Sequence, residues 1–392
     1  MKRVLVMGGG IGGSSAAYAL ALAGAEVTLV DAAHTGQATA AGAGIISYGG
    51  LRSSEDWYHF FLTATRAHER FVQLLENDGE GELGYGVVGE LVIAPDDPSE
   101  ERLGKIASEL EARRRESGNE RIGDVAVLAP DEARALFPPL RPGLAAVHVS
   151  GVARLDGRAF RDALRRVLEC RGVRVLAGTA RLRPTNSGAP VVEIDGETLT
   201  ADSVIVSAGA WTQEALAPLG IALPVEPQRG QIAHLGLEGV ETGSFPVLSG
   251  YERDYTVCFP PDRVVVGATR EERSGFDYRL TAAGVSQVLS RALAVAPGLA
   301  EATLREVRIG FRPATPDGLP ILGRLVEHEG LYCTTGFGPS GLTLAPYCGA
   351  LVAAEALGDG EILALVGAAS SKPLSEVLRP FSASRFDRSS TY

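Results

Sequence analysis

Residues 3–13, RVLVMGGGIGG, decide the fold of this chain. The apolar run at 3–7 is typical of a short buried strand, and residues 12–23 predict a helix. Residues 26–30 predict a second buried strand, which ends at Asp31. A strand, a helix and a strand in this order predict a parallel sheet with helices packed on its faces.

The spacing Gly8-x-Gly10-x-x-Gly13 between strand and helix predicts a dinucleotide site. The first glycine permits a tight turn, the second lets the backbone approach a pyrophosphate, and the third lets helix and strand pack closely. The helix N-terminus offers N–H groups and partial positive charge to the phosphates. Asp31 follows Gly13 by 18 residues. A carboxylate there accepts hydrogen bonds from both ribose hydroxyls and repels a 2′-phosphate, which disfavours NADP.

The next loop bears on which dinucleotide binds. Residues 38–46, ATAAGAGII, are nearly all small, so backbone N–H groups can close over a long cofactor buried inside the protein. A nicotinamide cofactor that leaves in each turnover does not need this wrapping. The loop therefore favours FAD, and an NAD-dependent dehydrogenase stays open as the alternative.

Composition disfavours several classes of partner. The 392 residues suit roughly two domains, and 45% hydrophobic with 22% charged residues is typical of a soluble globular protein. A formal net charge of −11 disfavours nucleic acid and anionic lipid as partners. No apolar run reaches the ~20 residues that a membrane span needs. Five glycines interrupt the N-terminal run that otherwise resembles a signal peptide, so we expect a cytoplasmic protein.

The cysteines and histidines predict no metal site. The four cysteines form no CxxC pair, and no histidine cluster has metal-ligand spacing. Free thiols in a reducing cytoplasm are the expectation. A homo-oligomer is compatible with the sequence, which leaves the oligomeric state open.

Beyond residue 50 the pattern continues to mix helices and strands. We expect an amphipathic helix over 56–78, a charged helix over 99–117 and a proline-rich crossing segment over 130–142. Residues 203–207 predict another buried strand, and an apolar helix is expected over 344–357.

Six later motifs carry a family resemblance. They are Arg154-Leu-Asp-Gly, Gly172-Val-Arg-Val-Leu-Ala-Gly-Thr, Val204-Ile-Val-Ser-Ala-Gly-Ala-Trp, Arg229-Gly-Gln, Gly310-Phe-Arg-Pro-Ala-Thr-Pro-Asp-Gly-Leu-Pro-Ile-Leu-Gly and Gly336-Phe-Gly-Pro-Ser-Gly-Leu-Thr. With the N-terminal turn and loop 38–46, the chain resembles the FAD-dependent amino-acid oxidoreductases, which include D-amino-acid oxidases, glycine oxidase, sarcosine oxidase and D-amino-acid dehydrogenases. The likeness covers nearly the whole chain.

The resemblance implies an α/β fold with two domains. One is a Rossmann-type FAD-binding domain, expected to be discontinuous over residues 1–50, 143–222 and 306–392. The other is an α+β substrate-binding domain built on a mostly antiparallel sheet, expected over residues 51–142 and 223–305.

The resemblance also places residues around the cofactor. The loop 336–343 resembles the segment whose N–H groups face the flavin N1 and O2 atoms, where negative charge gathers on reduction. Gly209 and Trp211 resemble the sheet end that lies against the cofactor. The expected cofactor-binding residues are Gly8, Gly10, Ile11, Gly12, Gly13, Asp31, Ala32, Thr39, Ala40, Ala43, Gly44, Ile45, Ala208, Gly209, Trp211, Gly336, Gly338, Pro339, Ser340, Gly341, Leu342 and Thr343.

Arg312 is the expected substrate-binding residue. In the branch of glycine oxidase and D-amino-acid dehydrogenase, the matching Arg grips the substrate carboxylate, since its planar fork suits both oxygens. A salt bridge that holds this segment of chain is the alternative. The family also places a Tyr hydroxyl on the carboxylate; Tyr255 fits that position best, and Tyr251 is the alternative. Candidates for the pocket wall are Ile45, Ile46, Tyr48 and Tyr251.

Four positions depart from the pattern of the family or of one of its branches. Gly42 stands where Asn is frequent, and Asp31 where Glu is commoner. Gly310 stands where the sarcosine-oxidase branch has a Cys bonded to the flavin, and Arg312 where that branch tends to have Tyr. We therefore expect non-covalent FAD, and a primary or cyclic amino acid rather than an N-methylated one.

The expected reaction is oxidative deamination of a small amino acid, either a D-amino acid or a glycine-like one. A hydride passes from the substrate Cα to flavin N5, and water hydrolyses the imino acid. Oxidation of another amine, such as sarcosine or proline, is the alternative within FAD chemistry. Either oxygen or an electron carrier would reoxidise the flavin.

Overall fold

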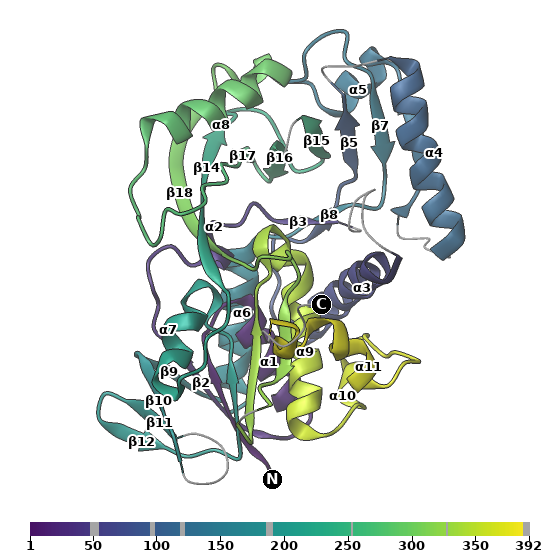
Figure 1. The fold of residues 1–392 in the computed structure, drawn as a ribbon. Helices are drawn as coiled ribbons and strands as arrows, with labels where there is room; N and C mark the ends of the chain where they lie inside the picture. Colours follow the sequence, from purple (N-terminus) through teal and green to yellow (C-terminus); the bar gives the residue numbers. More distant parts are fainter. Residues whose placement is uncertain are drawn as a thin grey trace, which may run out of the picture.

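Two large sheets organise the molecule, one above the other in the view of Figure 1. The computed structural model describes residues 1–47, 55–94, 99–117, 122–185, 191–251, 254–326 and 328–386. Tyr48, which the sequence proposed for the pocket wall, and the side chain of Tyr251 lie outside the described part.

The N-terminal strand–helix–strand unit forms the centre of a six-stranded sheet. In order across the sheet, its strands are β19 (Ile321–Arg324), β20 (Leu331–Thr335), β13 (Ser203–Val206), β1 (Arg3–Met7), β2 (Glu26–Asp31) and β9 (Arg174–Ala177). All neighbours pair in parallel except β19 and β20, which are antiparallel. The apolar strands are buried, which agrees with the parallel sheet predicted for this region.

Long helices cover this sheet. They are α1 (Ile11–Leu22), α3 (Glu55–Asn77), α6 (Gly157–Cys170) and α9 (Gly341–Leu357). Helices α1 and α9 pack directly on each other, and α3 packs on α9. The apolar segment Gly338–Leu357 is long enough to cross a membrane, with a mean hydropathy of 1.2, but 78% of it is buried inside the protein. In this fold the segment is a core helix.

The second large sheet has eight strands and is mostly antiparallel. In order, they are β18 (Thr303–Ala314), β14 (Glu226–Gly236), β17 (Arg263–Gly267), β16 (Asp254–Phe259), β15 (Val247–Tyr251), β5 (Glu90–Ile93), β7 (Ala146–Val149) and β6 (Val125–Leu128). Only β15 and β5 pair in parallel. The helices of this part are α4 (Glu100–Ser117), α5 (Pro130–Leu136) and α8 (Ala282–Val295).

Smaller elements complete the described chain. Two three-stranded sheets are formed by β10 (Ala180–Arg183), β11 (Val191–Ile194) and β12 (Glu197–Leu199), and by β3 (Ile45–Ile46), β8 (Ala153–Arg154) and β4 (Gly86–Val87). The short helices are α2 (Ala38–Ala41), α7 (Thr212–Leu216), α10 (Ile362–Leu365) and α11 (Leu374–Leu378). The 3-10 turns are η2 (Gly209–Trp211), η3 (Ala217–Leu219), η4 (Pro297–Leu299), η5 (Gly338–Ser340), η6 (Arg379–Phe381) and η7 (Ala383–Phe386).

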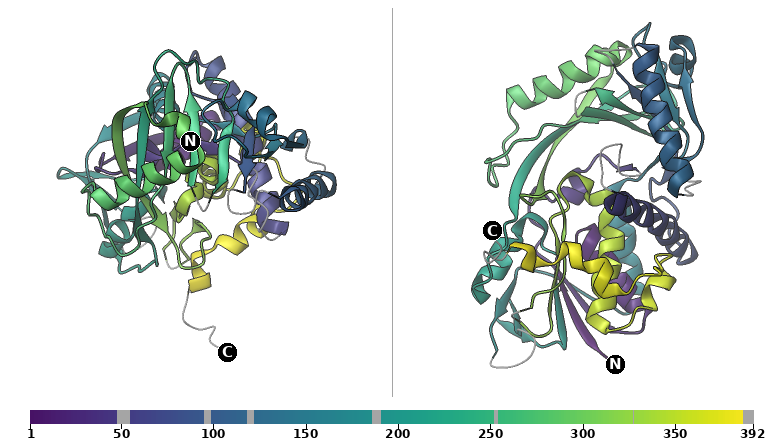
Figure 2. Two further views of the ribbon diagram at one scale, coloured as in Figure 1. Left: turned by 90° about the horizontal axis from the view of Figure 1, so that it is seen from above. Right: turned by 45° about the vertical axis from the view of Figure 1, so that its right-hand side comes forward.

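The antiparallel pair β14 and β18 joins the two halves. Figures 1 and 2 show these long strands running from the eight-stranded sheet down toward the six-stranded one. Their register pairs Gly230 with Gly310 and Gln228 with Arg312. The pair therefore carries residues of the Arg229-Gly-Gln and Gly310-Phe-Arg motifs to the space between the sheets.

The fold class predicted from the sequence is confirmed, a Rossmann-type α/β part with a second, mostly antiparallel part. The division into two discontinuous domains stays a prediction. Strand β7 belongs to the eight-stranded sheet although residues 143–222 were assigned to the FAD-binding domain, and β18 crosses the proposed boundary at 306. Segment 130–142, expected as a crossing segment, begins with helix α5. Pro130 suits a first helical position, and the Glu132 carboxylate accepts a hydrogen bond from Ala129 N at 2.8 Å.

A buried histidine on β14 makes the stability depend on pH. His234 is 2% exposed, and neither ring nitrogen has a hydrogen-bond partner among the described residues. Burial, followed by the positive charge of Arg308, lowers the pKa of His234 from 6.5 to about 4. The unfolded chain therefore takes up a proton below pH 6.5 while the folded chain does not, so the free energy of unfolding falls as the pH falls from 6.5 toward 4.

We expect His234→Leu to lose less stability than the unmodified protein on acidification. Between pH 6.5 and 4, protonation of this histidine in the unfolded chain lowers the free energy of unfolding by roughly 1.4 kcal/mol per pH unit. Melting temperatures at pH 7 and pH 5, measured by circular dichroism, check this. An equal drop in both proteins would contradict the assignment.

Candidate functional site

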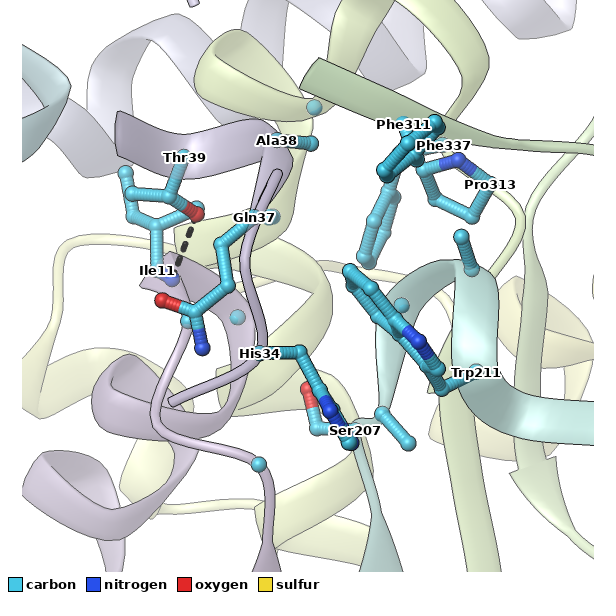
Figure 3. Close-up of a pocket in the computed structure, with 18 of the residues that line it drawn as sticks. Ile11, His34, Gln37, Ala38, Thr39, Ser207, Trp211, Phe311, Pro313 and Phe337 are labelled. Atoms are coloured by element: carbon cyan, nitrogen blue, oxygen red, sulfur yellow. Dashed lines mark hydrogen bonds between the residues drawn. The ribbon is translucent and has the colours of Figure 1, made fainter. Parts of the chain in front are cut away.

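A cavity of about 540 Å³ lies between the two sheets. At one end it is lined by the glycine turn after β1, and at the other by Gly230, Tyr255 and Arg312 from the eight-stranded sheet. Figure 3 shows side chains from both halves around it. The cavity therefore joins the predicted nucleotide motif to the predicted substrate residue.

The glycine turn is shaped by close backbone approaches. Gly8 has φ +111°, and a Cβ there would lie 2.2 Å from the Ser207 carbonyl oxygen of the neighbouring strand end. A Cβ on Gly13 would lie 1.9 Å from the Gly8 carbonyl oxygen. A Cβ on Gly10 would meet only the Thr39 hydroxyl, at 3.4 Å, so the space above Gly10 is open to the cavity. The turn fits a pyrophosphate at the N-terminus of α1.

Asp31 lies at the end of β2 and is 5% exposed. One of its oxygens accepts hydrogen bonds from the Ala33 amide at 3.2 Å and the Gln37 side-chain amide at 3.0 Å. Its other oxygen lies 3.4 Å from Arg165. Asp31 also lines the cavity, and its predicted hydrogen bonds with the ribose hydroxyls stay a prediction.

The small-residue loop closes one wall of the cavity. The Thr39 hydroxyl accepts a hydrogen bond from the Ile11 amide at 3.1 Å, which Figure 3 draws as a dashed line. Gly44 has φ +100°, and a Cβ there would lie 2.1 Å from the Leu155 carbonyl oxygen. A side chain at Gly42 would meet Leu342 at 2.6 Å. The small residues therefore let this loop pack against the chain before α6 and against the first turn of α9, and the Asn frequent in the family would not fit at Gly42 without a shift.

The substrate end is built around Arg312 on β18. Its Nη1 donates to the Thr269 carbonyl oxygen at 3.1 Å. A Cβ on Gly230, on the paired strand, would lie 2.5 Å from both terminal nitrogens of the guanidinium. Arg312 therefore lies flat across a glycine. It has no carboxylate partner within the described part of the chain, so the salt-bridge alternative has no support there.

Tyr255 lies next to this guanidinium. Burial raises the pKa of the Tyr255 hydroxyl, and the positive charge of Arg312 and a hydrogen bond with it act in the opposite direction. Arg270 is a second positive charge that acts on the same hydroxyl. The Tyr255 backbone pairs with Gly267, the last residue of β17. Arg270 follows three residues later in the chain. The substrate end of the cavity is therefore electropositive.

A buried ionic network holds the chain segment beside Arg312. Arg229 is 6% exposed and donates from Nε and Nη2 to one Glu271 oxygen at 3.0 and 2.5 Å. The other Glu271 oxygen accepts from the Gln231 amide and the Thr269 hydroxyl, each at 2.7 Å. Although burial raises the pKa of Glu271, these hydrogen bonds and the Arg229 charge leave that pKa below its ordinary value. The network places Thr269, whose carbonyl holds Arg312.

An aromatic stack borders the cavity on its nucleotide side. The His34 ring lies 4.7 Å from the Trp211 ring at an interplanar angle of 15°. Trp211 stacks in turn on Phe276 at 4.8 Å. Figure 3 shows His34 and Trp211 as neighbours. Both residues line the cavity, so His34 is part of this rim.

Most of the predicted cofactor-binding residues line the cavity. The exceptions among them are Gly13, Ala40, Gly336, Ser340 and Thr343. Gly13 has the packing role that the motif assigns to its third glycine. The Thr343 hydroxyl donates to the Ile45 carbonyl oxygen at 3.1 Å, so it ties the helix to the loop. Of the proposed wall residues, Ile45 lines the cavity, whereas Ile46 is buried in the core behind it.

Sequence reasoning missed one end of the cavity. Residues 178–183 and Glu214 line it beyond Asp31. The signal was present, because the motif that begins at Gly172 ends in Gly178-Thr179, but that motif was not assigned a contact with the cofactor. Gly230 was also missed, although it lies in the Arg229-Gly-Gln motif.

Among the described residues, the cavity offers no cluster of metal ligands and no thiol. No group of three His, Cys, Asp or Glu side chains gathers there or elsewhere among the described residues. Cys258, Cys333 and Cys348 are buried, Cys170 is exposed, and none of them lines the cavity. The arrangement therefore suits a long organic cofactor next to an anionic substrate.

Comparison with known proteins identifies the family of the chain. The family model DAO, FAD dependent oxidoreductase, matches residues 3–355. The oxidoreductase YurR of Bacillus subtilis is 43% identical over 91% of this chain and 95% of its own length. Glycine oxidase of Pseudomonas aeruginosa is 29% identical over 88% of this chain and 92% of its own length. The crystal structure of iminodiacetate oxidase from Chelativorans sp. BNC1 has 41% identity and a TM-score of 0.88, covering 97% of this chain and 98% of that one.

We expect Gly230→Ala to weaken substrate binding and to leave FAD bound. The new methyl group would meet the guanidinium of Arg312, a flexible side-chain end that can move away without unfolding the sheet. Gly236→Ala is the matched control, because it lies on the same strand and would displace the exposed Arg305 instead. The check is the KM for an amino acid or amine that reduces the bound flavin. The flavin content of each variant is measured by absorbance. Equal KM values in the two variants would contradict the placement of Arg312.

Proposed function

The chain belongs to the DAO family of FAD-dependent oxidoreductases, and on that premise we propose that it oxidises the carbon–nitrogen bond of a small amino acid whose carboxylate Arg312 holds. Family membership makes the protein an FAD-dependent oxidoreductase that acts on amino or amine groups. It also decides between the two cofactors considered from the sequence, in favour of FAD over NAD.

The observation that carries the proposal is the unpaired charge of Arg312 in the cavity. A guanidinium has five N–H donors in a planar fork. Arg312 uses one for the Thr269 carbonyl and shares a hydrogen bond with Tyr255, so donors remain for a carboxylate. A half-buried guanidinium that lines a cavity and has no carboxylate partner in the described part of the chain favours binding of an acid. Tyr255 can add a hydroxyl donor to the same carboxylate.

The residues of this chain would bind and orient the substrate. Arg312 and Tyr255 would hold the carboxylate at the end of the cavity away from Asp31, which directs the Cα toward the middle of the cavity. When bound, FAD supplies the redox chemistry by accepting a hydride from the substrate. The substrate amine loses a proton, and water hydrolyses the imine product. No side-chain base is required if the amine enters deprotonated.

We propose that FAD is held without a covalent bond. Position 310 carries no thiol, and a Cβ there would lie 2.7 Å from the Ala41 Cβ. The described residues that line the cavity include no cysteine. We also keep the sequence predictions of a cytoplasmic location and of oxygen or an electron carrier as acceptor.

A second candidate substrate is an amine with two carboxymethyl groups, such as iminodiacetate. The 41% identity with an iminodiacetate oxidase over nearly the whole chain favours it. Arg270, an exposed residue outside the cavity lining whose positive charge acts on Tyr255, offers a second cationic group for the other carboxylate of such a substrate. Oxidation of one C–N bond followed by hydrolysis would then release glycine and glyoxylate.

We expect Arg312→Ala to lose at least about a hundredfold in kcat/KM, because removing one partner of a buried charge pair costs about 3 kcal/mol. FAD should remain bound. The matched control is Arg305→Ala, on the same strand but paired with Asp262 at the surface. Anaerobic bleaching of the flavin by glycine, sarcosine, proline, D- and L-amino acids and iminodiacetate provides the measurement. Unchanged bleaching in Arg312→Ala would remove this residue from substrate binding.

The variant Arg270→Ala distinguishes between the two candidate substrates. We expect this variant to raise the KM for iminodiacetate by about tenfold, the loss of one charge-assisted hydrogen bond. The KM for glycine should change little, since glycine has one carboxylate. Steady-state kinetics with both substrates are the check. If iminodiacetate fails to reduce the flavin of the unmodified protein, the second candidate is rejected and the first remains.

A further inference from the structure

Helix α9 contains a proline that removes a hydrogen bond from its first turn. Pro346 lies inside the helix and has no N–H. In an α-helix, the N–H of residue 346 would donate to the carbonyl of Leu342. That carbonyl lies in the interior, where an unpaired acceptor is costly. The first turn of α9 therefore needs a donor from elsewhere in the molecule.

His68, on helix α3, is that donor. Its Nε2 lies 2.6 Å from the Leu342 carbonyl oxygen, across 274 residues of sequence, and its side chain is fully buried. Burial lowers the pKa of His68 to about 4, so the ring is neutral near pH 7. A neutral ring has one N–H, and the carbonyl acceptor requires that it be on Nε2. Nδ1 has no hydrogen-bond partner among the described residues.

The carbonyl that His68 holds belongs to the cavity wall. Leu342 lines the cavity, and its side chain fills the spaces left by Gly42 and Gly157, where a Cβ would lie 2.6 and 2.8 Å from it. Gly341 and Ala345, on the same turn, also line the cavity. The N-terminus of α9, a helix of 17 residues, thus presents its N–H groups and positive dipole end toward this space.

We propose that His68 is a positioning residue that replaces the helical donor lost at Pro346, and thereby sets the N–H groups of the first α9 turn that face the flavin. This rests on the proposed placement of FAD in the cavity. Donors fixed at this turn stabilise negative charge on a reduced flavin better than donors that can turn away. His68 should therefore raise both the affinity for FAD and the reduction potential of the bound flavin.

A double-mutant cycle on the FAD-loaded protein tests this proposal. We expect His68→Leu to weaken FAD binding by about tenfold, the effect of one unsatisfied buried acceptor, and to lower the flavin midpoint potential. Pro346→Ala in the same chain restores a backbone N–H at 346, so His68→Leu/Pro346→Ala should recover both quantities. His68→Gln keeps a side-chain donor, so its FAD affinity and midpoint potential should lie between those of the unmodified protein and His68→Leu. His59→Leu, on the exposed face of α3, is the control.

The readouts are the FAD dissociation constant of the reconstituted apoprotein, the midpoint potential against reference dyes, and the melting temperature. An unchanged potential and affinity in His68→Leu would overturn the proposal. A lower melting temperature alone would do the same, because it indicates only a structural role. If His68→Leu does not fold, the double variant His68→Leu/Pro346→Ala decides the test. The proposal is overturned if this double variant fails to recover folding, FAD affinity and midpoint potential together. Absence of bleaching by any amine, with the cycle as expected, would reject the proposed substrate instead.

Discussion

The structure depends on one packing constraint, the close approach of backbone segments through glycine at the floor of the cavity. Strand β1 and helix α1 meet where a Cβ on Gly13 would lie 1.9 Å from the Gly8 carbonyl oxygen. Helix α9 continues this contact, because a Cβ on Gly349 would lie 2.4 Å from the Gly12 carbonyl oxygen. The N-termini of both helices are thereby brought to the same cavity. Two sources of N–H groups and positive dipole then face one cavity.

The opposite wall obeys a different constraint, since it must leave room for a half-buried positive charge. The antiparallel register of β14 and β18 pairs Arg312 with Gln228, and the Arg312 side chain reaches back over Gly230, where only a glycine leaves room for the guanidinium. The Arg229–Glu271 pair neutralises its own charges nearby, whereas Arg312 has no such partner in the described chain. The buried, paired Arg229 holds the structure, whereas the half-buried Arg312 keeps donors for a ligand.

Several features of this site were predictable from local patterns, and others were not. The strand–turn–helix motif predicted Gly8, Gly10 and Asp31 at the cavity, because their roles depend on neighbours within one supersecondary unit. The helix predicted over 344–357 begins three residues earlier, at Gly341. The place of His68 beside Leu342 could not be predicted, since a lone histidine on an amphipathic helix gives no sign of its acceptor. Residues 178–183 were missed for a related reason: they reach the cavity only through the pairing of β9 with β2.

By itself the sequence predicted the class of fold and the dinucleotide turn, because these follow from periodicity and from residue types at short spacing. The family and FAD were implied by the resemblance of motifs along the whole chain, and the family match confirms them. Only the tertiary structure showed that the Arg312 side chain lies over Gly230, that the charge of Arg270 acts on Tyr255, and that His68 hydrogen-bonds the carbonyl that Pro346 leaves without a helical donor. Each of those facts requires segments distant in sequence to share one buried space, and burial turns a hydrogen bond or a charge into a strong constraint.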